Sequence, residues 1–322
     1  MRTVYAAGDR SLPSIGGAIA SLVTPFRDDL LDLAGLREHV EWQILSGIDG
    51  LAVCSVAGEG PVLTAAERES VIVTCVAAAG GRVPVIAATG SHCTARTIEA
   101  TRLAQEAGAD AALITVPYYS KPGQKGILAH FNAIASACDI PVIIDNRPAH
   151  TGIDLAPMTV EQLGSIRTVI GLADGSADIS RACAWSRLLP SHVGVYTSND
   201  ATALTFMLSG GAGSISDAAN IAPRLTAALQ HAASAGNLSA ATCLERRLQP
   251  LWQALAADGT AAALKAALAL AGRPVGPVTR LPLVGVDRLV EIGIRDALQA
   301  VGVETIGGCS GTSVVLPHPL PL

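Results

Sequence analysis

Short apolar stretches alternate with longer stretches of mixed character along most of the chain. Each short stretch is a continuous run of apolar residues, which is typical of strands covered on both faces. The longer stretches have helical spacing, and several begin with Thr and end at Gly, as helix capping prefers. The runs that we expect to be strands are AIASLV (18–23), GLAVCSV (50–56), VPVIAAT (83–89), AALITV (111–116), PVIIDN (141–146), TVIGLA (168–173), VGVYT (193–197) and GSIS (213–216).

Eight such strand–helix units occupy residues 17–233 and predict an α/β fold, a (β/α)8 TIM barrel. An open doubly wound sheet is the alternative. Three further helical stretches follow without strands and predict a C-terminal helical appendage at 234–300. The ends, 1–16 and 301–322, have the composition of loosely held tails. In a barrel of this kind the active site is built at the C-terminal ends of the strands and on the loops that follow them.

Composition and charge exclude several classes of protein. Half of the residues are apolar and 15% are charged, which permits a large core. A net charge of −5 argues against a nucleic-acid surface, and the absence of a run of about 18 apolar residues argues against a membrane span. The seven cysteines have neither a disulfide framework nor zinc-ligand spacing. We therefore expect a cytoplasmic protein with reduced thiols and without a metal or cofactor.

Several stretches near the predicted strand ends resemble the dihydrodipicolinate synthase and N-acetylneuraminate lyase family of pyruvate-handling aldolases. The resemblance spans roughly residues 17–300, in the family's order. It implies a (β/α)8 barrel with C-terminal helices, assembled as a homo-oligomer, either a dimer or a tetramer. The stretches are GAIASLVTPF (17–26), Gly58-Glu59, VPYYSKPGQ (116–124), DNRPAHTG (145–152) and SNDATALTFMLSGGAGSIS (198–216).

The resemblance places an alanine where the family has its reactive lysine. That lysine ends the sixth strand, in a motif G-[IVL]-K-[DE], and forms a Schiff base with the keto group of pyruvate. Here the motif reads GLAD (171–174), so Ala173 stands in the lysine's place, and a methyl group cannot form an iminium. The chain has three lysines, of which Lys121, on the loop after the fourth strand, is the least unsuitable substitute; Lys125 and Lys265 are the others.

Other positions that the resemblance marks as catalytic have also changed. The family's proton-relaying tyrosine is Asp145 here, and its carboxylate-holding arginine is His150. The family's G-[TS]-[TS]-G-E loop reads SVAGE (55–59), in which Ser55 retains a hydroxyl. Tyr119 is kept, and in the family this tyrosine reaches the site of the neighbouring subunit.

These replacements suggest acid–base chemistry. A carboxylate beside an imidazole is a workable general acid–base pair, so we take Asp145 and His150 as candidate catalytic residues. Asp174, at the end of the sixth strand, is a third candidate. Tyr119 is a fourth, because its hydroxyl and that of Ser55 could stabilise an enolate. The alternatives are that Asp145 caps a turn or pairs with Arg147, and that His150 is an ordinary loop residue.

Substrate binding is assigned to the same loops. Arg147 could replace the lost arginine as a carboxylate clamp, because guanidinium binds carboxylate in a fork, although an outer salt bridge is equally compatible with the sequence. The resemblance implies that the backbone amides of the SVAGE loop bind a carboxylate, which assigns binding roles to Ser55, Val56 and Ala57. Ala173 and Ser214, in the sixth and eighth predicted strands, complete the set. A metal site built from His92, Cys93 and His150 has no recognised ligand spacing, and a nucleophilic Cys93 or Cys54 is less common than a packed one.

Three functions from different classes remain. The first is a lyase-type enzyme (a dehydratase, isomerase, cyclase or decarboxylase) that acts on a small oxo or hydroxy carboxylate without a Schiff base. The second is a non-catalytic protein that binds a small acid or a partner subunit, a reading that Val56, Ala57 and Ala173 favour. The third is a pyruvate aldolase with a relocated lysine. We favour the first, because Asp145 and His150 introduce reactive groups where loss of function would leave inert ones.

Overall fold

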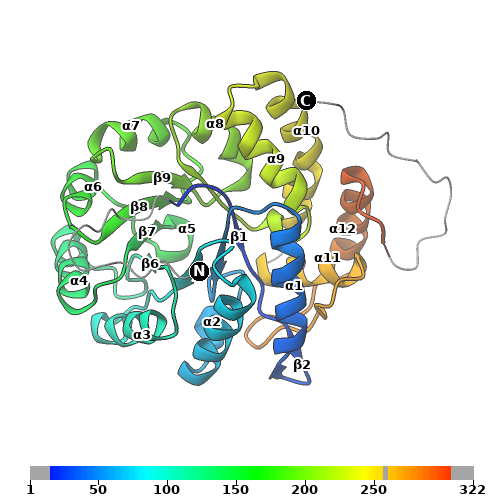
Figure 1. Ribbon diagram of the computed structural model, residues 1–322, viewed down its shortest axis with the longest axis horizontal. Coiled ribbons are helices and arrows are strands. Elements are labelled where there is room, and N and C mark those ends of the chain that lie inside the picture. The colour runs from blue at the N-terminus through cyan, green and yellow to red at the C-terminus, as the bar shows by residue number, and fades with distance from the viewer. Residues whose placement is uncertain (1–14, 257–259, 306–322) are drawn as a thin grey trace.

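Eight parallel strands close into a barrel in the computed structural model, which describes residues 15–256 and 260–305. Neighbouring strands follow one another in chain order, and β1 pairs with both β4 and β10, which closes the ring (Figure 1). The (β/α)8 barrel is confirmed, and the open sheet is excluded. The barrel strands are β1 (Gly17–Ser21), β4 (Gly50–Val53), β5 (Val85–Ala88), β6 (Ala111–Thr115), β7 (Val142–Asn146), β8 (Val169–Asp174), β9 (Gly194–Thr197) and β10 (Gly213–Ser216).

Helices surround the strands and cover their outer faces (Figure 1). Capping follows the sequence signals at several ends: Thr64 and Glu67 form a capping box at α2, and Gly80 ends that helix with a φ of +56°. The helices around the barrel are α1 (Leu33–Leu45), α2 (Ala65–Ala79), α3 (Thr94–Glu106), α4 (Gln124–Ala137), α5 (Pro148–Thr151), α6 (Pro157–Gly164), α7 (Ser180–Leu188), α8 (Ala203–Leu208) and α9 (Pro223–Ser234).

Short elements decorate the loops, and the sequence pattern did not predict them. A two-stranded ribbon, β2 (Phe26–Arg27) with β3 (Leu30–Leu31), lies between β1 and α1. Three 3-10 turns follow β4, β9 and β10, and they belong to the loops that build the mouth of the barrel: η1 (Gly60–Val62), η2 (Asp200–Thr202) and η3 (Ala218–Asn220).

The apolar runs are explained by burial on both faces of the sheet. Interior side chains such as Ile19, Ile86 and Ile215 pack together inside the barrel. Outward-facing neighbours such as Leu51 and Leu172 pack instead against the surrounding helices. Because both faces are apolar, the strands show no alternation in sequence even though their side chains alternate in space.

The C-terminal helices pack together beside the barrel (yellow to red in Figure 1). They are α10 (Leu238–Leu255), α11 (Thr260–Leu270) and α12 (Arg288–Val301). Their apolar residues share one cluster with Val23 and Ala57 on the loops after β1 and β4, so they contact the end of the barrel that carries the loops. Most of both predicted tails, 1–16 and 301–322, lies outside the described residues. No described helix is long and apolar enough to cross a membrane.

Gly171 in β8 provides a test of how tightly the barrel interior is packed. A Cβ at this position would lie 2.6 Å from Cε2 of Tyr196, whose ring is fully buried and whose hydroxyl donates to the carbonyl of Ile15. We expect Gly171→Ala to lower the free energy of unfolding by about 1–3 kcal/mol, because the ring has no room to move away. The measurement is urea-induced unfolding. Gly285→Ala, where a Cβ meets nothing within 4 Å, is the control, and an equally small loss in both variants would contradict the expectation.

Candidate active site at the barrel mouth

The end of β8 presents a methyl group to the barrel interior. Ala173 is fully buried and belongs to the interior cluster with Ile143. Because side chains alternate along a strand, the next carboxylate points the opposite way. Asp174 accepts hydrogen bonds from Trp185 Nε1 at 3.0 Å and Arg181 Nη1 at 3.3 Å, both on α7. Asp174 was predicted to face the site, and it lies on the helix side of the strand instead.

Asp145 and Arg147, at the end of β7, form a buried ion pair. Nε of Arg147 lies 3.0 Å from Oδ1 of Asp145 and 3.1 Å from Oδ2, and the two side chains are 8% and 3% exposed. Thr115 donates to Oδ2 at 3.0 Å and Ser198 to Oδ1 at 3.3 Å. Both oxygens of Asp145 are therefore occupied by donors, which is the pairing alternative weighed from the sequence.

Two further carboxylates face the same guanidinium, and the sequence analysis missed both. Burial opposes the charge of Arg147, but Asp145, Asp217 and Asp200 together raise its pKa. Burial and the charge of Asp217 raise the pKa of Asp200 to about 6, although Ala218 N donates to Asp200 at 2.9 Å. Burial likewise raises the pKa of Asp217, against the opposing charge of Arg147. The mouth thus gathers three carboxylates around one guanidinium.

His150 lies on α5, directly after β7. Burial, assisted by the positive charge of Arg147, lowers the pKa of its imidazole below the ordinary value of 6.5. His150 is therefore neutral near pH 7 and available as a base. Pro148 favours the start of this short helix, and Gly152, with a φ of +68°, ends it.

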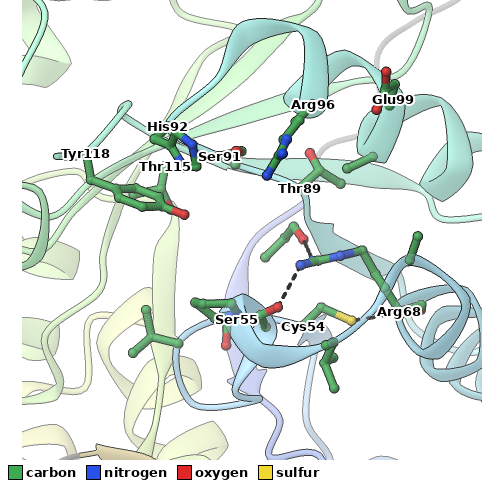
Figure 2. A pocket seen from close by; sticks show the side chains of 18 of the residues that line it. Cys54, Ser55, Arg68, Thr89, Ser91, His92, Arg96, Glu99, Thr115 and Tyr118 are labelled. Atoms are coloured by element: carbon green, nitrogen blue, oxygen red, sulfur yellow. Dashed lines mark hydrogen bonds between the residues drawn. The ribbon is translucent and has the colours of Figure 1, made fainter. Parts of the chain in front are cut away.

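A pocket of about 680 Å³ extends outward from the mouth, between the ends of β4, β5 and β6 and helices α2 and α3. Ser55, Thr115 and His150 line it where it meets the barrel. Farther out, Figure 2 shows the Arg96 side chain directed into the pocket, across from Tyr118. The pocket has polar groups at both ends, as a site for a small polar molecule requires.

The loop after β4 forms one wall of this pocket. The amides of Val56, Ala57 and Gly58 donate to no acceptor within the described part of the chain. Ser55, which is buried, lies with its Oγ 2.8 Å from Oγ of Ser21 at the end of β1. Unpaired amides and a hydroxyl in one loop are suitable for binding an anion.

A buried ion pair anchors this loop to the C-terminal helices. Nζ of Lys265, on α11, lies 2.5 Å from Oε1 of Glu59, and neither side chain is exposed. The same ammonium donates to the carbonyl of Val278 at 2.8 Å and lies 4.1 Å from the centre of the Phe26 ring. Burial lowers the pKa of Lys265, although Glu59 opposes the shift.

The remaining predicted residues lie away from the mouth. Tyr119 is 92% exposed, so its own chain does not bring it to the site. Ser214 is buried, with its hydroxyl accepting from Gln230 Nε2 of α9 at 2.8 Å, on the outer face of β10. Lys121 is exposed, and its side chain passes over Gly152 at the end of α5.

Neither thiol chemistry nor a protein-bound metal finds support in the described residues. Cys54 is buried, and burial raises the pKa of its thiol to about 11, which leaves it protonated and unreactive. The described chain contains no group of three or more His, Cys, Asp or Glu side chains arranged to hold a metal ion.

Comparison with known proteins agrees with this geometry. The model of the Dihydrodipicolinate synthetase family matches residues 14–301. The 4-hydroxy-tetrahydrodipicolinate synthase of Methylobacterium radiotolerans is 41% identical over 287 residues, covering 89% of this chain and 96% of that protein. The enzyme of the same name from Cereibacter sphaeroides is 40% identical, covering 90% of this chain and 99% of that protein.

Solved structures show the same similarity. The dihydrodipicolinate synthase of Aquifex aeolicus superposes with a TM-score of 0.88 at 32% identity, covering 91% of this chain and 100% of that one. The chloride-inhibited dihydrodipicolinate synthase of Acinetobacter baumannii, complexed with pyruvate, gives a TM-score of 0.88 at 35% identity, covering 90% and 99%.

The Lys265–Glu59 pair predicts a large cost for removing one partner. We expect Lys265→Met to lower the free energy of unfolding by about 3–5 kcal/mol, because Glu59 would remain charged and buried without its partner. The double variant Lys265→Met/Glu59→Gln should recover much of this loss. Chemical unfolding of the single and double variants measures both effects, and a double variant no more stable than Lys265→Met would contradict the explanation.

The raised pKa of Asp200 predicts a pH dependence of stability. Above pH 6 the carboxyl is ionised in both the folded and the unfolded protein, so the cost of burying its charge is fully present. Below about pH 4 it is protonated in both, and this cost disappears. Asp200→Asn should therefore gain stability over the wild type above pH 6, and the gain should shrink as the pH falls to 4. Unfolding free energies across this range test it, with the exposed Asp28→Asn as control. A difference that is independent of pH would contradict the assignment.

Proposed function

The chain belongs to the Dihydrodipicolinate synthetase family of lyase-type enzymes, and we propose that it acts on a small oxo or hydroxy carboxylate by acid–base chemistry without a Schiff base. The observation that carries this proposal is the methyl group of Ala173, fully buried at the end of β8. A Schiff base requires a primary amine within reach of the substrate carbonyl. The mouth offers instead an imidazole and several carboxylates.

The lysines of the chain support the same conclusion. Lys265 is buried in an ion pair with Glu59 and does not line the pocket. Lys121 and Lys125 are both exposed, and neither lines the pocket. No specific observation therefore favours an aldolase with a relocated lysine.

The substrate carboxylate is assigned to the unpaired amides of Val56, Ala57 and Gly58. Arg147 is a weaker candidate for this role, because it is already paired with Asp145. We assign Asp145 to holding Arg147 in place, since its oxygens accept four hydrogen bonds and none is left for the substrate.

His150 is assigned as the base. Its imidazole lines the pocket and is neutral near pH 7, so it can accept a proton from the carbon next to the substrate carbonyl. The electron pair of the broken C–H bond moves onto the carbonyl oxygen, where the hydroxyl of Ser55 can donate a hydrogen bond. Enolisation of this kind is the step common to the dehydratase, isomerase and decarboxylase alternatives, and the end product depends on the substrate.

Assembly into a homo-oligomer, a dimer or a tetramer, forms part of the proposal. Tyr119 is 92% exposed, with a positive φ of +65°. A large aromatic side chain held out into solvent in this way is suited to contact with a second subunit. No nucleic-acid, membrane or cofactor partner is proposed.

Pyruvate serves as a probe of both halves of the proposal. We expect the wild-type protein to accelerate exchange of the pyruvate methyl hydrogens in D2O, followed by proton NMR, and to gain no mass when pyruvate and borohydride are added together. His150→Asn should lower the exchange rate about 100-fold, as loss of a general base does. His192→Asn, an exposed histidine outside the pocket, is the matched control.

The other outcomes each identify a different function. A mass gain on a lysine would establish the aldolase and overturn the proposal. Pyruvate binding by the wild type without exchange at any pH would identify a non-catalytic acid-binding protein. Exchange that is equally fast in His150→Asn would remove His150 as the base.

A further inference from the structure

Asp217 is a buried carboxylate that the proposed chemistry has not yet used. It follows β10, and its Oδ1 is shielded from solvent and has no hydrogen-bond partner in the described chain. A buried polar atom without a partner is uncommon, and such atoms often mark functional sites. The groups around Asp217 are Asp145 on β7, Arg147 directly after β7, His150 on α5, Asp200 on η2 and Ser21 on β1.

Two hydroxyls connect Asp217 to the pocket. Ser21 and Asp217 follow the paired residues Ala20 and Ser216 at the ends of β1 and β10, and the Ser21 hydroxyl acts on the carboxylate of Asp217. Oγ of Ser21 also lies 2.8 Å from Oγ of Ser55. Both serines are buried, which shields the connection from water, and Ser55 lines the pocket. The two hydroxyls thus lie between the Asp217 carboxylate and the pocket wall.

Asp145 and Asp217 differ in whether their carboxylate oxygens already have hydrogen-bond partners. Arg147, Thr115 and Ser198 occupy the two oxygens of Asp145 with hydrogen bonds. Asp217 has one free oxygen, and no ion pair joins it to the described cations. Of the two carboxylates, only Asp217 has a buried oxygen left without a hydrogen-bond partner in the described chain.

We propose that Asp217 is the proton source for the substrate oxygen, acting through Ser21 and Ser55. This inference rests on the proposed function. As His150 takes the proton from carbon, the electron pair of that C–H bond moves through the new C=C bond to the oxygen. Ser55 donates its proton to the substrate oxygen. Ser21 then donates a proton to Ser55, and Asp217 donates one to Ser21. The products are the neutral enol, the imidazolium of His150 and the carboxylate of Asp217, and the reverse transfers restore the starting state.

The direction of the pKa shifts agrees with this division of work. Burial raises the pKa of the Asp217 carboxyl, which favours its protonated form. Burial lowers the pKa of His150, which favours the free base. Pairs of titratable groups whose surroundings shift their pKa values in opposite directions provide an acid and a base at one pH.

Pyruvate methyl exchange, recorded as a function of pH, tests the inference. In the wild type the rate should rise as His150 loses its proton and fall again as Asp217 loses its own. Asp217→Asn should lower the maximum about 100-fold and remove the fall at high pH, because an amide cannot supply the proton. Ser21→Ala should lower the rate similarly, because it interrupts the line of hydroxyls, whereas Asp217→Glu should restore part of it.

Asp200→Asn is the matched control, because Asp200 contacts Asp217 without joining the line of hydroxyls. It should retain exchange, and removal of the neighbouring negative charge should move the fall to lower pH. Circular dichroism and unfolding curves establish that each variant is folded.

Each remaining result has a definite meaning. Full exchange in Asp217→Asn or in Ser21→Ala, with an unchanged pH profile, would overturn the role of Asp217 while leaving the proposed function intact. Absence of exchange in the wild type would overturn the proposed function and this inference with it. A folded Asp217→Asn whose rate falls at every pH, with the high-pH limb retained, would mean that Asp217 acts on the shape of the site alone.

Discussion

One buried guanidinium organises the charged groups at the barrel mouth. Arg147 is paired directly with Asp145 and attracts Asp200 and Asp217, so carboxylates from three loops share a single positive charge. In a poorly solvated site such like charges repel strongly unless a cation or a proton separates them. The charge of Arg147 therefore opposes part of the effect of burial on Asp217.

The same electrostatic balance produces acid and base strength without an amine. Burial, assisted by the charge of Arg147, lowers the pKa of His150, and burial, assisted by neighbouring carboxylates, raises the pKa values of Asp200 and Asp217. A family that depends on a lysine uses the positive charge of an iminium to accept electrons. In the proposed reaction, with Ala173 at that position, stabilisation of an enolate is assigned to the amides and hydroxyls of the mouth, which the loop after β4 and the end of β1 provide.

Residues outside the barrel hold the loop after β4 in place. Glu59 closes it with a left-handed backbone, φ +53°, and is fixed by Lys265 from α11 and by the amide of Arg280, which donates to it at 2.9 Å. The C-terminal helices thus form part of the support for the pocket wall. The one buried lysine among the described residues has a structural role here, since its amine is enclosed by Glu59, Phe26 and a backbone carbonyl.

The sequence by itself determined the barrel, because buried parallel strands are uniformly apolar and their helices carry recognisable caps. It also predicted that Asp145, Arg147, His150 and Ser55 lie at the barrel mouth, since each stands at or just after the end of a predicted strand, where a barrel places its site. Only the tertiary structure decided which side chains meet. Asp174 turned outward because side chains alternate along β8, and Asp217 joined Ser21 because β1 pairs with β10 when the barrel closes. Contacts of this kind join positions far apart in the chain, and their pKa shifts arise from burial and neighbouring charge, neither of which exists until the strands have come together.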